Sequence, residues 1–233
     1  MQRIYTLKEL ASFLNRTQKE LRKLAENDVL HGRKVQGEWL FALPDIVQWM
    51  DRQMTKVDDE KKRHFEKALE SAAEDHEEVD FRELLSPNLV ELNFTAKTQP
   101  SVILRLVKIA EDAGALWDPE SMAEDLRERE KMASTALENG VAILHPRRPR
   151  PDIIADDFLV VAIASNGVPF GGGFGNLTDV FFLLCSHSDI FHLRAIGRLA
   201  SVVRKPGVLD KLRAATSPND VVELLAKEAE SFD

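Results

Sequence analysis

Short apolar runs alternate with helical patterns over the second half of the chain. Three of these runs, at 141–144, 158–164 and 179–185, are bounded by turn residues and have the length of buried strands. Apolar positions recur at helical spacing in the segments around them, which are 100–113, the segment after 118, 190–203 and 218–229. The alternation predicts an α/β fold in which helices sandwich a mixed β-sheet.

The first 54 residues show short helical patterns and one hairpin. Capping-box sequences begin at Thr6 and Thr17, each with a glutamate three residues later, and Asn15 suits the end of the first helix. A hairpin is expected to turn at Gln36 and Gly37, and a third helix to start at 43–45 and run through Trp49. This order predicts a compact helix-turn-helix domain with a wing.

A charged segment separates these two regions. Residues 55–80 hold ten acidic and five basic residues and neither glycine nor proline, so a charged helical linker is expected between domains at 1–54 and 81–233. A short heptad seam recurs at Phe65, Leu69, Ala72, His76 and Val79. The seam fits a homodimer, and an extension of the third helix packing on either domain fits equally.

Composition narrows the class of protein. The net charge of −8 over 233 residues argues against a protein that coats nucleic acid, although a small DNA-binding domain remains compatible with it. A single cysteine, Cys185, allows no intrachain disulfide, and its apolar surroundings favour a buried thiol. We expect a cytoplasmic protein, because the sequence has neither an apolar stretch of about 20 residues nor a signal-peptide pattern.

Residues suited to phosphate chemistry gather around one predicted strand. Arg129 and Glu130 lead into the apolar run at 141–144, which ends at His145 and is followed by Arg147 and Arg148. A neutral imidazole can act as a nucleophile without an auxiliary base. The charge of a phosphohistidine would then need cationic donors.

The stretch REKMASTALENGVAILH, residues 129–145, resembles an active-site signature. It is similar to RE-x-x-x-ST-G-x-G-x-G-x-A-x-P-H of the phosphotransferase-system enzyme IIA proteins of the fructose, mannitol and nitrogen-regulatory type. Upstream, LLSPNLVELNFTAKTQPSVILRLVKIAEDAGAL resembles the opening strand and first helix of that family. Downstream, DVFFLLCSHSDIFHLRAIGRLASVV resembles its H-L-x-x-L-x-x-L-A helix. The resemblance covers about 81–233 and implies the α/β fold of that family.

The resemblance implies roles for several residues. His145 corresponds to the phosphoryl-accepting histidine, Arg129 to the active-site arginine and His192 to the second active-site histidine. Residues expected in the phosphate environment are Arg147, Thr135 and Asn139. The resemblance implies a phosphocarrier histidine protein as donor and no metal or nucleotide cofactor. The chain departs from the signature at Leu144, where the family has proline, and at Ala136 and Glu138, where it has glycine.

The first 54 residues resemble the excisionase-like and MerR-like winged helix-turn-helix domains. That resemblance places the second helix in the major groove of DNA, with Gln18, Lys19, Arg22 and Lys23 as contact residues. Arg33 and Lys34 on the wing would then contact phosphate or the minor groove. Nine basic against seven acidic residues give a mild electrostatic footprint, so a protein-interaction domain with solvated faces is the alternative.

These features lead to three functional hypotheses. The first is a phosphoryl-accepting protein whose phosphorylation regulates its DNA or protein contacts, as in transcription or nitrogen regulation. The second is a non-catalytic interaction protein that retains the enzyme IIA fold, which Leu144 and the missing glycines favour. The third is a IIA component for a sugar transport system encoded elsewhere.

Overall fold

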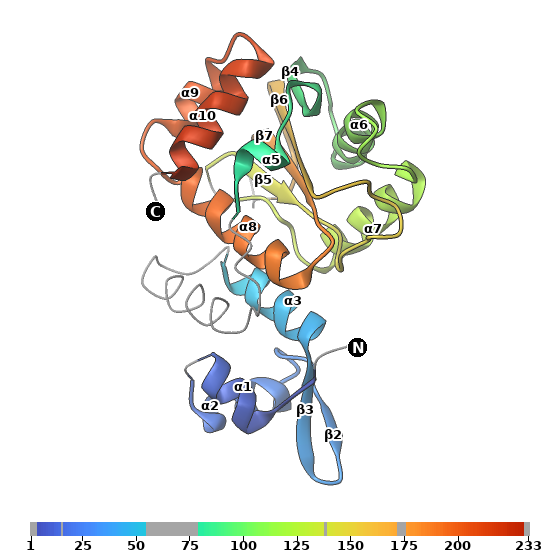
Figure 1. Cartoon of the computed structure of the whole chain (residues 1–233), viewed down its shortest axis with the longest axis vertical. Coiled ribbons are helices and arrows are strands. Elements are labelled where there is room, and N and C mark those ends of the chain that lie inside the picture. Colours follow the sequence, from blue (N-terminus) through green and yellow to red (C-terminus); the bar gives the residue numbers. More distant parts are fainter. Residues whose placement is uncertain (1–3, 15, 55–78, 138, 172–175, 231–233) are drawn as a thin grey trace. The chain divides into compact units, whose positions relative to one another are not determined.

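A computed structural model of the chain describes residues 4–14, 16–54, 79–137, 139–171 and 176–230 (Figure 1). Contacts between residues divide the chain into two compact units. The N-terminal unit comprises 1–78 and 189–197, and the C-terminal unit comprises 79–188 and 198–233. Most of the predicted linker and heptad seam lies outside the described residues, so both remain predictions.

The N-terminal unit holds a small antiparallel sheet with the strand order β1-β3-β2. Its elements in chain order are β1 (Ile4–Thr6), α1 (Leu7–Phe13), α2 (Gln18–Glu26), β2 (Arg33–Val35), β3 (Glu38–Ala42) and α3 (Leu43–Met54). Gln36 and Gly37 both have positive φ angles, of 50° and 90°, as a two-residue hairpin turn requires. The predicted hairpin and third helix are confirmed, while β1 was not predicted.

Both predicted capping boxes are present in the N-terminal unit. The Thr6 hydroxyl accepts from the Glu9 backbone N–H at 3.3 Å, and the Glu9 carboxylate accepts from the Thr6 backbone N–H at 2.8 Å. Thr17 and Glu20 repeat the arrangement at the start of α2. Leu14 follows α1 as its C-terminal cap. The predicted role of Asn15 falls on a residue outside the described ranges.

The C-terminal unit is built on a four-stranded mixed sheet with the order β4-β6-β7-β5. Its strands are β4 (Val90–Phe94), β5 (Val141–Leu144), β6 (Phe158–Val168) and β7 (Thr178–Cys185). β4 runs parallel to β6 and β5 runs parallel to β7, whereas β6 and β7 are antiparallel. The C-terminal ends of β5 and β7 therefore lie at the same end of the sheet as the start of β6.

Helices cover the sheet of this unit on both faces. The helical elements of this unit are α5 (Phe81–Leu84), η1 (Pro87–Leu89), α6 (Gln99–Asp112), α7 (Pro119–Met132), α9 (Val208–Arg213) and α10 (Pro218–Glu230). A further helix, α8 (Asp189–Val202), begins with residues 189–197, which group with the N-terminal unit. α6 and α7 lie on one side of the sheet, and α9 and α10 lie on the other (Figure 1). Both faces of β5, of β7 and of the first seven residues of β6 are almost fully buried, which explains their continuous apolar runs.

The main hydrophobic core lies between the sheet and the pair α6 and α7. It includes alternate residues of β5 and β7 such as Leu144 and Phe181, packed with Leu106 of α6 and Leu126 of α7. Phe181 makes edge contacts with Phe94 and Phe170, with ring centroids 5.8 and 5.2 Å away. The predicted mixed sheet and its four main helices are confirmed. The short helices α5 and α9 were not predicted.

Candidate functional site

His145 directly follows the last residue of β5 and is 4% exposed. All four residues of β5 are buried, which fixes the position from which the histidine leaves the sheet. Pro146 follows it, and a residue before proline is restricted to extended backbone conformations. The chain thus has proline after the histidine instead of before it, and this proline also narrows the backbone freedom of the histidine.

Two hydrogen bonds define the protonation of the His145 ring. Nδ1 lies 3.0 Å from the carbonyl oxygen of Ile143, which can only accept. Nε2 lies 3.1 Å from Nε of Arg129, which can only donate. The ring therefore carries its proton on Nδ1 and keeps a lone pair on Nε2. This neutral tautomer is the nucleophilic form of imidazole.

Arg129 is held in place by contacts at both ends of its guanidinium group. It lies in the last turn of α7, where a second guanidinium nitrogen, Nη1, donates to the Ala133 carbonyl at 2.8 Å. The side chain is buried, with 4% of the residue exposed. The sheet and α7 therefore bring together two residues that the sequence predicted as partners.

Glu130 organises the segment that follows α7. Its buried carboxylate accepts from the Thr135 backbone N–H at 3.2 Å, from the Thr135 hydroxyl and from Gln99 Nε2 at 3.1 Å. Gln99 Nε2 and the Ser134 hydroxyl both donate to the Phe170 carbonyl at 3.3 Å. Burial raises the pKa of the Glu130 carboxyl, while the hydrogen bonds from Thr135 lower it. Gln99 was missed by the sequence analysis.

The residue that replaces one family glycine adopts an ordinary backbone conformation. Ala136 forms an antiparallel bridge with Ala142, and the neighbouring Leu137 N–H donates to the Val141 carbonyl at 2.7 Å. The φ angle of Ala136 is not positive, so no glycine is required at that point. Gly140, which matches the signature, has a φ of +85°. Glu138 lies outside the described residues.

The other predicted phosphate contacts lie before and after β5 in the sequence. Thr135 is buried beside Glu130, and Arg147 is exposed two residues after His145. Asn139 precedes the start of β5, where its Nδ2 donates to the Val203 carbonyl at 3.3 Å. The whole length of β5 therefore separates Asn139 from His145, and the structure does not bring these two residues together.

His192 lies in α8 and is buried, with 5% of the residue exposed. Residues 189–197 group with the N-terminal unit, whereas His145 belongs to the C-terminal unit. The predicted approach of His192 to His145 therefore stays a prediction. His187, before α8, donates from its backbone N–H to Asp157 Oδ1 at 2.7 Å, and its ring Nδ1 lies at the same distance from that oxygen.

The residues predicted to contact DNA are all exposed. Gln18, Lys19, Arg22 and Lys23 project from α2, and Arg33 and Lys34 lie on β2. Steps of four residues link Gln18 to Arg22 and Lys19 to Lys23, so they form one polar face of the helix. Within the described ranges, no group of three or more histidine, cysteine or acidic residues is arranged to hold a metal ion. None of the helices in those ranges combines the length and apolarity that crossing a membrane requires.

Comparisons with known proteins identify relatives of this chain. The chain is 32% identical over 105 residues to a nitrogen regulatory protein of Bradyrhizobium diazoefficiens, covering 44% of this chain and 67% of that protein. It is 23% identical over 145 residues to the fructose-specific EIIABC component of Bacillus subtilis, covering 61% of this chain but only 22% of the component.

One chain in a solved complex of mannitol enzyme IIA and phosphorylated enzyme IIB from Escherichia coli has a similar fold. It matches at a TM-score of 0.53 and 22% identity, covering 61% of this chain and 97% of that chain. The family model for the phosphoenolpyruvate-dependent sugar phosphotransferase system, EIIA 2, matches residues 83–228. Because this match spans more than half of the sequence, the chain belongs to the EIIA 2 family of the phosphotransferase system.

Proposed function

We propose that His145 accepts a phosphoryl group on Nε2 from a phosphocarrier histidine protein. The observation that carries the proposal is the neutral tautomer set by Ile143 and Arg129, because it leaves the nucleophilic lone pair on Nε2. An imidazole donor and an imidazole acceptor exchange a phosphoryl group with little covalent help from the protein. Positioning and charge stabilisation therefore supply most of the catalysis.

The transfer is an in-line displacement at phosphorus. The lone pair of Nε2 forms the new N–P bond while the N–P bond of the donor breaks, and the donor imidazole keeps that electron pair. The proton on Nδ1 stays in its hydrogen bond with the Ile143 carbonyl throughout. Arg129 releases the Nε2 lone pair and turns its guanidinium toward a phosphoryl oxygen, where its charge offsets that of the phosphate.

Neighbouring donors complete the phosphate environment in this proposal. Arg147 follows the histidine at an exposed position, and Thr135 is held beside the site by Glu130. His192, at the start of a helix, would add a further donor, as the family resemblance implies. We leave Asn139 out of this environment because it lies at the opposite end of β5.

The relatives and the N-terminal unit together suggest what this chain binds. The mannitol enzyme IIA has been solved in complex with phosphorylated enzyme IIB, and a nitrogen regulatory protein is among the matches. We propose that the N-terminal unit makes this chain a phosphorylation-responsive regulator with a DNA-binding domain. The basic face of α2 and the exposed Arg33 and Lys34 support that assignment. A homodimer would supply the paired contacts that a single small module needs.

Binding of the full chain to genomic and random DNA at two salt concentrations tests the DNA-binding part. Affinity should fall steeply with salt, and the double variant Lys19→Gln, Arg22→Gln should reduce the slope of log K against log salt by about 1 for each phosphate that is no longer bound. Lys8→Gln, an exposed charge on α1, is the matched control. A DNA affinity that changes neither with salt concentration nor in the double variant would refute the DNA-binding role.

A second candidate is a non-catalytic interaction protein that keeps the enzyme IIA fold. The burial of His145 favours this candidate, since little imidazole surface is left for a donor. The two candidates differ in one chemical product, an Nε2 phosphohistidine. After incubation with enzyme I, phosphocarrier protein and phosphoenolpyruvate, ¹⁵N and ³¹P NMR should report an N–P bond at Nε2 of His145. Phosphorylation at Nδ1 would refute the mechanism proposed above, and no N–P bond would favour the second candidate.

A further inference from the structure

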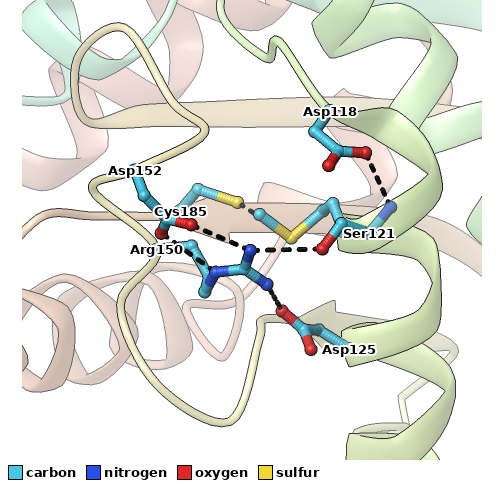
Figure 2. Close-up of polar contacts among 7 residues, drawn as sticks. Asp118, Ser121, Asp125, Arg150, Asp152 and Cys185 are labelled. Carbon is cyan, nitrogen blue, oxygen red and sulfur yellow. Dashed lines mark hydrogen bonds and ion pairs between the residues drawn. The ribbon is translucent and has the colours of Figure 1, made fainter.

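Arg150 forms a clamp between α7 and the segment that follows His145. Its Nη2 donates to the Ser121 hydroxyl at 3.1 Å, and its Nη1 pairs with the carboxylate of Asp125 (Figure 2). Nε and Nη2 also hold the two carboxylate oxygens of Asp152, each at 3.0 Å. The guanidinium thus contacts three side chains, two from the helix and one from its own loop.

The residues that hold Arg150 share a helix face with the residue that holds His145. Ser121, Asp125 and Arg129 occur at four-residue steps of α7, so they lie in one row along the helix. Arg129 binds His145 at one end of the segment 145–150, and Asp125 with Ser121 binds Arg150 at the other. Both ends of a six-residue segment are therefore tied to the same row of side chains.

The segment between the two ties is short and stiff. Pro146 and Pro149 each fix a φ angle and restrict the residue before them, so 145–150 has few backbone conformations. Pro146 is buried, whereas Arg147 and Arg148 are exposed. Moving Arg150 away from α7 would shift this stiff segment as a unit, and the His145 ring would move with it.

We propose that Arg150 is a positioning residue that keeps His145 Nε2 against Arg129. β5 has only four residues, and its pairing with β7 and with the segment 135–137 ends before His145, so the sheet by itself fixes the histidine only from its N-terminal side. The Arg150 clamp fixes the other side without touching the reacting atoms. The expected effect on the phosphorylation rate rests on the proposed phosphoryl transfer. The expected effect on the His145 ring can be measured in the unphosphorylated protein.

The test uses the full chain and three variants. Arg150→Gln removes the charge and most of the clamp, and Arg150→Lys keeps the charge but loses the planar fork. Arg105→Gln is the matched control, because Arg105 forms an equally bidentate pair with Glu91 between α6 and β4, away from His145. Thermal unfolding establishes that each variant is folded before the two readouts below are compared.

The first readout is the ¹⁵N chemical shift of the His145 ring in the unphosphorylated protein. We expect the wild type and Arg105→Gln to give one Nδ1–H tautomer and Arg150→Gln to give a mixture, since Nε2 loses its fixed donor. The second is the rate of phosphorylation against donor concentration. Arg150→Gln should lower kcat by up to about 10²-fold with little change in KM, and Arg150→Lys should recover part of the loss.

The outcomes separate this inference from the proposed function. A folded Arg150→Gln protein with the wild-type tautomer and kcat would overturn the positioning role. Equal changes in Arg150→Gln and Arg105→Gln, in both the ¹⁵N shift and the phosphorylation rate, would also overturn it. The effect would then follow from the loss of any such ion pair. If the wild type is not phosphorylated, the proposed function fails, yet the tautomer shift in Arg150→Gln still supports or refutes the positioning role.

Discussion

Arg129 Nε donates to His145 Nε2 at 3.1 Å, although the two residues are sixteen positions apart in the sequence. The contact places a permanent cation against the nitrogen that we propose as nucleophile. In the resting protein the guanidinium holds the neutral ring in one tautomer. During transfer the same group lies within reach of the phosphoryl oxygens. In this proposal Arg129 therefore donates to the His145 ring before transfer and to a phosphoryl oxygen after it.

Replacing Arg129 tests this double role. Arg129→Gln should lower the rate of phosphoryl transfer on the order of 10²-fold, because the transition state loses its nearest cation. Arg129→Lys should recover only part of the rate, since a lysine cannot donate to the Ala133 carbonyl and to His145 in the same fork geometry. The measurement is the initial rate of phosphorylation by saturating phosphocarrier protein.

Arg127→Gln provides the control for that experiment. Arg127 lies two residues earlier on α7 and pairs with the exposed Glu124, so its removal changes the charge of the helix but not the site. We expect its rate to equal that of the wild type. Equal rates for the Arg127→Gln and Arg129→Gln variants would mean that the Arg129 contact has no catalytic part.

Glu130→Gln should change the pH dependence of stability. Burial raises the pKa of the Glu130 carboxyl above its ordinary value of 4.5. At pH values above 4.5, the folded state therefore binds more protons at this site than the unfolded chain does. The site therefore stabilises the fold most at low pH, and its contribution falls as pH rises from 4.5 through the raised pKa. We expect the unfolding free energy of the wild type minus that of Glu130→Gln to fall over this range.

Urea denaturation at successive pH values measures this difference. Glu128→Gln is the control, because Glu128 is exposed and pairs with Lys131 on the surface of α7. Its difference from the wild type should show no such fall. A wild-type advantage over Glu130→Gln that grows with pH would show that the ionised carboxylate is the stabilised form, and that its hydrogen bonds outweigh burial.

The thiol of Cys185 should react only when the C-terminal unit opens. The residue is 1% exposed, its Sγ lies 4.0 Å from Met122 Sδ, and burial raises the pKa of the thiol (Figure 2). Labelling by a thiol reagent should therefore be slow in the native protein and should accelerate with urea in parallel with unfolding. Prompt labelling of the native protein, at a rate independent of urea, would contradict this burial.

Restoring the family glycine at Ala136 should not improve the protein. Ala136 pairs with Ala142 in an extended conformation, so Ala136→Gly should lower the unfolding free energy by about 0.5–1 kcal/mol and leave the phosphorylation rate no higher. Gly140→Ala is the informative contrast. Its φ is +85°, and an added Cβ would lie 2.9 Å from Arg213 Nη2 and 3.0 Å from Asp179 Oδ1.

Thermal or urea unfolding of these two variants gives the comparison. The decrease in unfolding free energy for Gly140→Ala should exceed that for Ala136→Gly, because strain at a positive φ adds to steric crowding. A faster phosphorylation rate in Ala136→Gly would instead indicate that the missing glycine limits the activity of this chain.

Local signals predicted the elements well. Thr6 and Thr17 mark helix starts because a hydroxyl and a glutamate three residues later satisfy the free backbone N–H groups, and no distant contact is needed. Gln36 and Gly37 mark a turn for a similarly local reason. α5 and α9 have four and six residues, too few for a periodic signal to emerge. Their formation depends on packing in the folded unit.

Site residues that share a sequence motif were predicted, whereas those that only the fold brings together were missed. Arg129 and His145 were found because a family signature spaces them, but the clamp of Arg150 on Asp125 joins residues 25 positions apart with no motif. Gln99 reaches Glu130 across 31 positions for the same reason. The family signature also pointed to Asn139, but β5 lies between Asn139 and His145, and a β-strand carries neighbours apart by about 3.3 Å per residue.

The most direct test of phosphoryl acceptance is the intact mass of the chain after incubation with enzyme I, phosphocarrier protein and phosphoenolpyruvate. The wild type and His31→Ala, which lacks a histidine remote from the site in sequence, should each gain one acid-labile phosphoryl group. His145→Ala should gain none. A full gain in His145→Ala, or no gain in the wild type with active donors, would contradict the account.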